Sequence, residues 1–196
     1  MKILFPLLLI SGCASEKSDT AEHDSENVDG YNYDLAVACH PEVEGWGGAL
    51  TYTEFELLDA VNATRAQGAN CGEFGDFAPA EPLEMHPNLH CAARYHSLWM
   101  ANNGTLSHES PGGDLGSDPW ERIESAGFPG LPIGENVAVG QPNPSQVMIS
   151  WMNSGGHCAN IMSPDANRFG AGYYVDGANP MVPYWTQKFG YRGAEN

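Results

Sequence analysis

Basic side chains are scarce in this sequence, which has 8 Lys and Arg against 25 Asp and Glu and a formal net charge of −17. A protein that binds nucleic acid needs a basic face to contact phosphates, so no nucleic-acid partner is expected. The same charge disfavours electrostatic docking on anionic lipid. The acidity itself indicates solubility rather than a particular ligand.

A hydrophobic run long enough to cross a bilayer is also missing near the N-terminus, because a spanning helix needs roughly 20 apolar residues. The apolar stretch Ile3–Ile10 is short, follows Lys2 and precedes Ser11, Gly12 and Cys13. This is the pattern of a cleaved signal, and it resembles a bacterial lipobox. We expect a lipoprotein signal peptide at 1–12, with an ordinary signal peptide as the alternative.

Lipidation of Cys13 would anchor the protein to the membrane of the bacterial cell envelope. Because no Asp follows Cys13, the outer membrane is the expected location. Residues 13–38 include seven Asp and Glu, one Lys and few aliphatic side chains, which predicts a disordered acidic tether. Residues 39–196 have the length of one domain with a substantial core.

Closely spaced cysteine pairs of the C-x-x-C type are absent, which disfavours a structural zinc site. Apart from Cys13, the chain has four scattered cysteines: Cys39, Cys71, Cys91 and Cys158. An even number in an exported protein predicts two disulfides, and the spacing leaves all three pairings open.

Hydrophobic spacing and turn residues predict an α+β domain with an antiparallel sheet covered by helices. A Thr53–Glu56 capping box suggests where the first helix begins, and His96 is expected in the core. The expected helices are 53–67, 87–102, 117–126 and 144–153, the expected strands are 133–139, 169–175 and 184–189, and 157–162 is expected to be a compact turn.

Six blocks of the sequence resemble, in the same order, those of the CAP (SCP-like) superfamily of cysteine-rich secretory, antigen 5 and pathogenesis-related proteins. The blocks are Leu57–Arg65, Leu106–His108, Gly134–Ala138, Trp151–Met162, Gly170–Tyr173 and Tyr184–Gly190. The resemblance implies a three-layer α-β-α sandwich with a central, mainly antiparallel sheet and a shallow cleft. It also implies pairing of Cys71 with Cys158 and of Cys39 with Cys91, with Cys71–Cys91 as the rival.

In many members two His and two Glu line this cleft and bind a divalent metal, often zinc. His108, Glu135 and His157 match three of these positions, whereas Ser154 stands where the second Glu is usual. Asn136, beside Glu135, is expected to support the cleft. Glu109 is a further carboxylate that could compensate for the missing one.

Three functions remain open from the sequence. The first is a binding module for a lipid, cell-wall or protein ligand, which we favour because the family shares binding rather than one reaction. The second is a zinc-dependent, protease-like hydrolase using His108, Glu135 and His157, since two imidazoles and a carboxylate form a catalytic type of zinc shell. The third is an envelope scaffold in which these side chains are only structural.

Overall fold

The computed structural model describes residues 39–175 and 182–193. Its main sheet has the strand order β3-β5-β6-β4, in which the short β3 is parallel to β5 and the other pairs are antiparallel. The bounds are Glu84–Met85 for β3, Arg168–Val175 for β5, Pro183–Tyr191 for β6 and Leu131–Val139 for β4. The predicted antiparallel sheet is confirmed, and β4 lies at one edge of it.

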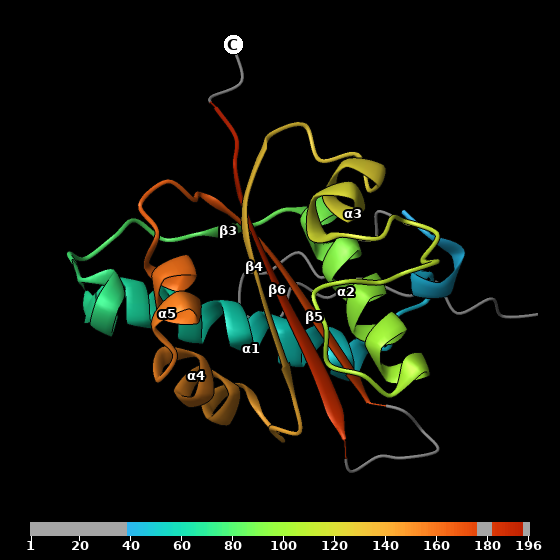
Figure 1. Cartoon of the computed structure of the whole chain (residues 1–196), viewed down its shortest axis with the longest axis horizontal. Helices are drawn as coiled ribbons and strands as arrows, with labels where there is room; N and C mark the ends of the chain where they lie inside the picture. The colour runs from blue at the N-terminus through green and yellow to red at the C-terminus, as the bar shows by residue number, and fades with distance from the viewer. Residues whose placement is uncertain (1–38, 176–181, 194–196) are drawn as a thin grey trace, which may run out of the picture.

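Helices cover both faces of this sheet and complete the three predicted layers (Figure 1). One face carries α1 (Gly48–Arg65), α4 (Pro144–Met152) and α5 (Gly155–Met162), and the other carries α2 (Pro87–Asn103) and α3 (Pro119–Ser125). The larger core lies on the first face, where apolar side chains of α1 pack with Trp151, Trp185 and Phe189.

Two glycines of β5 set the distance between the sheet and α2. A Cβ added at Gly170 would lie 2.2 Å from the carbonyl carbon of Leu89, and one at Gly172 would lie 2.2 Å from the carbonyl oxygen of Ala93. Glycine is therefore required for the backbone of α2 to approach β5 this closely.

The first helix begins five residues earlier than predicted, at Gly48, and the expected capping box does not form because Thr53 lies inside the helix. Its hydroxyl donates instead to the carbonyl oxygen of Ala49 at 3.0 Å. The earlier start is stabilised by tertiary contacts, since Glu54 in this first part is fully buried and accepts a hydrogen bond from Trp46 Nε1.

The segment predicted as a compact turn at 157–162 is instead part of the helix α5. The buried guanidinium of Arg65 donates to the carbonyl oxygens of Ile161 and Ser163 at 2.7 and 2.8 Å, and so binds the C-terminal end of this helix. The predicted loop after α1 also holds short elements: β1 (Ala69–Asn70), the 3-10 helix η2 (Gly72–Phe74) and β2 (Asp76–Phe77). A second 3-10 helix, η1 (Pro41–Val43), precedes α1.

Two disulfides join Cys39 to Cys91 and Cys71 to Cys158. These are the pairs that the family resemblance implies, and the rival bond between Cys71 and Cys91 is not formed. The first fixes the segment before α1 to α2, and the second fixes the η2 loop to α5. The predicted signal peptide 1–12, Cys13 and the tether 13–38 lie outside the described residues. Among the described helices, none has the length and apolar character needed to cross a membrane.

Candidate functional site

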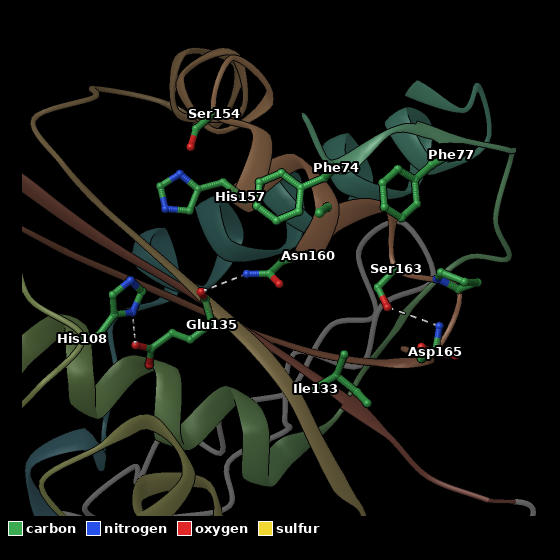
Figure 2. A pocket seen from close by; sticks show the side chains of 13 residues that line it. Phe74, Phe77, His108, Ile133, Glu135, Ser154, His157, Asn160, Ser163 and Asp165 are labelled. Carbon is green, nitrogen blue, oxygen red and sulfur yellow. Dashed lines mark hydrogen bonds and ion pairs between the residues drawn. The ribbon is translucent and has the colours of Figure 1, made fainter. Parts of the chain in front are cut away.

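A pocket of about 680 Å³ lies against the edge strand β4, and we call it the edge pocket. Besides β4, its walls come from four parts of the chain: the loop between α2 and α3, the helix α5 with Ser154 before it, the segment 163–165 after α5, and the η2–β2 segment (Figure 2). Its lining includes His108, Glu135, Ser154, His157, Phe74 and Phe77. All three predicted cleft residues and Ser154 therefore meet in one pocket.

The imidazole of His108 is held by the carboxylate of Glu135. His108 Nδ1 lies 2.8 Å from Glu135 Oε1, the contact marked in Figure 2. The His108 side chain is 48% exposed, whereas that of Glu135 is only 2% exposed. An ionised carboxylate only accepts hydrogen bonds, so Nδ1 carries the proton, and in the neutral ring Nε2 is the acceptor.

Two buried cations balance the negative charge of Glu135. The Lys188 ammonium pairs with Glu135 Oε2, and Arg122 Nη2 lies 3.0 Å from the same oxygen. Burial alone would raise the pKa of Glu135, but Lys188, His108, His96 and Arg122 together hold this pKa well below its usual range. Burial lowers the pKa of Lys188 to about 8, despite the attraction of Glu135.

Arg122 also fixes the loop that carries His108. Its Nη1 donates to Ser110 Oγ at 2.5 Å, and its Nη2 donates to the carbonyl oxygen of His108 at 2.6 Å. The guanidinium therefore binds both the backbone of His108 and the carboxylate that orients the ring.

His157 lies in the first turn of α5 and approaches the edge pocket from the face of the sheet opposite to that of His108. Asn136 does not line the pocket but supports it from behind, because its Nδ2 donates to the carbonyl oxygen of His157 at 3.1 Å. Asn160 Nδ2 donates to Asn136 Oδ1 at 2.8 Å and to the carbonyl oxygen of Glu135. Burial and the nearby His108 lower the pKa of His157, so its neutral form is favoured.

The aromatic wall was not identified from the sequence. It consists of Phe74, which lies between Gly72 and Gly75 and is 53% exposed, and of Phe77 in β2. The two glycines have φ values of 63° and 92°. A phenylalanine between two glycines in an otherwise polar loop was the available signal. The tryptophans of the described chain do not line the pocket, and Trp151 and Trp185 are buried in the core.

A zinc shell of three protein ligands that includes Glu135 does not fit this arrangement. The carboxylate is already paired with Lys188 and Arg122 and bonded to His108, so a divalent ion there would add charge beside two buried cations. Among the described residues, no group of three or more His, Cys, Asp or Glu is placed to hold a metal. Glu109 is exposed and does not line the pocket, so it does not replace the missing carboxylate.

The comparisons agree with this fold. The chain is 37% identical over 109 residues to the "Uncharacterized protein YkwD" of Bacillus subtilis. The aligned part makes up 56% of this chain and 39% of that protein. An extracellular protein containing an SCP domain from Bacillus anthracis shares the fold with a TM-score of 0.59 and 22% identity, over 72% of this chain and 41% of that one.

An outer surface protein of Borrelia burgdorferi gives a TM-score of 0.56 at 17% identity, over 72% of this chain and 94% of that one. These two likenesses concern the fold alone, and the chain spans about two fifths of the two Bacillus proteins. The model of the "CAP: Cysteine-rich secretory protein family" matches residues 58–189, which carry the edge pocket and both histidines. The chain therefore belongs to the CAP family.

Proposed function

We propose that the protein is a binding module of the bacterial cell envelope and that its ligand occupies the edge pocket. One observation carries this proposal: His108 and His157 reach the same open pocket from opposite faces of the sheet. Each is positioned by buried hydrogen bonds, His108 through Glu135 and His157 through Asn136. Positioned polar groups in a preformed pocket are the usual basis of ligand recognition.

Binding is favoured over hydrolysis because the described residues of the pocket show no general base paired with a nucleophile. Glu135 is paired with two cations, and Ser154 stands where a second carboxylate is usual. A hydrolase needs a group that takes a proton during the reaction. The remaining candidates are the imidazoles of His108 and His157 and the carboxylate of Asp165, and none of them, within the structure described, is hydrogen-bonded to a side-chain nucleophile of the pocket. Divalent metal binding is a secondary proposal that rests on the two imidazoles alone.

We further propose that lipidated Cys13 anchors the module to the outer membrane through the tether 13–38. The lipobox-like sequence before Cys13 supports this location. Replacement of Cys13 by Ser is expected to release the protein from the membrane fraction and to abolish its labelling by a fatty-acid probe. Unchanged labelling of the Cys13→Ser variant would rule out this anchor.

The binding function is tested with the full chain carrying Cys13→Ser, so that the lipid does not contribute. Retention is measured on purified cell-wall sacculi and on vesicles of phosphatidylethanolamine and phosphatidylglycerol. We expect the double variant His108→Gln/His157→Gln to lose retention, while Glu109→Gln, outside the pocket, keeps it. Release of cleaved products would instead favour a hydrolase, and equal retention of both variants would favour a scaffold without a pocket ligand.

A further inference from the structure

Phe74 is an exposed aromatic ring on an unusually constrained loop. The loop is closed by the antiparallel pairing of β1 with β2, and its Cys71 is bonded to Cys158 of α5. Gly72 and Gly75 on either side of the ring adopt the left-handed φ values that favour glycine. A ring that is 53% exposed yet fixed in place loses little conformational entropy when a ligand packs on it.

The Phe74 ring also lies directly beside the start of α5, the helix that carries His157. A Cβ added at Gly155 would lie 2.9 Å from Phe74 Cδ2, so this glycine lets one edge of the ring rest on the start of α5. Figure 2 shows the ring next to His157, with Phe77 beyond it and His108 across the pocket. An apolar surface and two hydrogen-bonding imidazoles therefore border the same space.

The polar groups suit hydroxyl ligands. With Nδ1 donating to Glu135, His108 Nε2 offers an acceptor in the neutral ring and a donor in the protonated ring, and a hydroxyl can bond to either. A neutral His157 offers one donor and one acceptor, and the hydroxyl of Ser154 offers both. The Ser154 side chain makes no capping hydrogen bond to α5, although it stands at the N-cap position.

Charge and lining disfavour anionic and purely apolar ligands. Asp165 adds a carboxylate to the pocket lining, and the net charge of −17 repels phosphate groups and other anions. An acyl chain would leave the imidazoles and Ser154 without partners, which is costly for groups removed from water. A neutral molecule with an apolar face and many hydroxyls fits both the aromatic ring and the polar groups of the pocket.

We infer that the edge pocket binds a neutral saccharide, with the apolar face of one sugar ring stacked on Phe74 and its hydroxyls bonded to His108 and His157. This inference rests on the proposed binding function and names its ligand class. Such glycans come from two sources, the N-acetylated strands of the cell wall and polysaccharides that lack acetamido groups. The shared chemistry is the sugar ring.

The test measures binding of chitotetraose and cellotetraose to the full chain by calorimetry, in a detergent without a sugar headgroup. We expect Phe74→Ala to weaken binding by about tenfold, because the stacked contact is lost. Phe74→Tyr keeps the aromatic face and is expected to bind like the wild type. Tyr52→Ala is the matched control, since Tyr52 is 50% exposed and does not line the pocket.

Tighter binding of chitotetraose assigns the glycan to the cell wall, and tighter binding of cellotetraose assigns it to polysaccharides without acetamido groups. Equal binding means that the pocket recognises only the sugar ring that both share. The inference is overturned when neither oligosaccharide binds, or when Phe74→Ala binds as well as Phe74→Tyr. Retention on sacculi or vesicles that still depends on His108 and His157 would then leave the proposed module standing with a different ligand. If the folded wild type neither binds an oligosaccharide nor is retained on sacculi or vesicles, the proposed binding function is contradicted as well.

Discussion

Glu135 and His108 form a pair in which a buried carboxylate holds a half-exposed imidazole, with Oε1 and Nδ1 2.8 Å apart. The carboxylate is in turn paired with Lys188 and Arg122, and both of these cations are fully buried. The orientation of a solvent-facing ring therefore depends on an ion cluster beneath it that solvent does not reach.

Replacing Glu135 by Gln is expected to destabilise the protein by about 3–5 kcal/mol, because Lys188 and Arg122 would keep their buried charges without a counter-charge. Urea unfolding followed by circular dichroism measures this loss. Glu109→Gln is the control, and as an exposed substitution it should change stability by less than about 0.5 kcal/mol. Similar stabilities of the two variants would show that the cluster contributes little.

The two disulfides should separate stability from binding. Replacing both cysteines of either pair by Ser is expected to cost about 2–4 kcal/mol. Only loss of Cys71–Cys158 should also weaken oligosaccharide binding, because this bond fixes the loop of Phe74 to the helix of His157. Thermal unfolding and calorimetry on both variants check this, and equal affinities would contradict it.

Gly172→Ala is expected to destabilise the protein by at least about 2 kcal/mol, since the new methyl group would meet the backbone of α2 at Ala93. Gly48→Ala is the matched substitution in open space, where no atom lies within 4 Å of the added Cβ. At the start of α1 it should be neutral or stabilise by up to about 1 kcal/mol. Urea denaturation measures both variants, and the midpoint of Gly172→Ala should lie clearly below that of Gly48→Ala.

His96 should contribute a loss of stability on mild acidification, which the buried carboxyl of Glu54 opposes because burial raises its pKa to about 7. Burial lowers the pKa of His96 from 6.5 to about 3, although Glu135 partly opposes this. Between these two values the unfolded chain binds a proton that the native protein does not, so the free energy of unfolding decreases as pH falls. Between a pH of about 6.5 and about 5 this single site contributes about 2 kcal/mol.

The variant His96→Gln retains an amide that can donate to the carbonyl oxygen of Ser107, the partner of His96 Nε2 at 2.8 Å. Its free energy of unfolding should decline less steeply below a pH of about 6.5 than that of the wild type. Urea titrations at several pH values measure the difference, and parallel declines would exclude His96 as the source.

A chelator should leave the thermal unfolding midpoint unchanged, because the charge of Glu135 is balanced by Lys188 and Arg122 rather than by a metal ion. Scanning calorimetry of the full chain with and without EDTA measures this. A clear drop in the midpoint would mean that a metal ion supports the fold.

The sequence predicts the fold well where the signal is local or where the family blocks are present. The helix at 87–102 and the strands at 169–175 and 184–189 lie within two residues of α2, β5 and β6. The start of α1 and the helical nature of α5 were missed, because contacts from Trp46 and Arg65 stabilise them across the fold. Side-chain contacts between distant residues leave no periodic pattern in the sequence.

The same reason explains which parts of the site were found. His108, Glu135 and His157 match the family's cleft positions, whereas the role of Arg122 and Lys188 was not predicted because it depends on where Glu135 lies in space. Lys188 does stand in an aromatic strand (YWTQKFGY), and a charge in such a run is a reason to expect a buried partner. Phe74 lies outside every block.

The bond between Cys39 and Cys91 has a mechanical consequence. A pull on the chain before residue 39 would load α2 directly, at the helix that the glycines of β5 hold against the sheet. Residues 40–47 would bear little of that force, because the covalent bond bypasses them. Tension applied at residue 39 would therefore not peel the domain open from its N-terminal end.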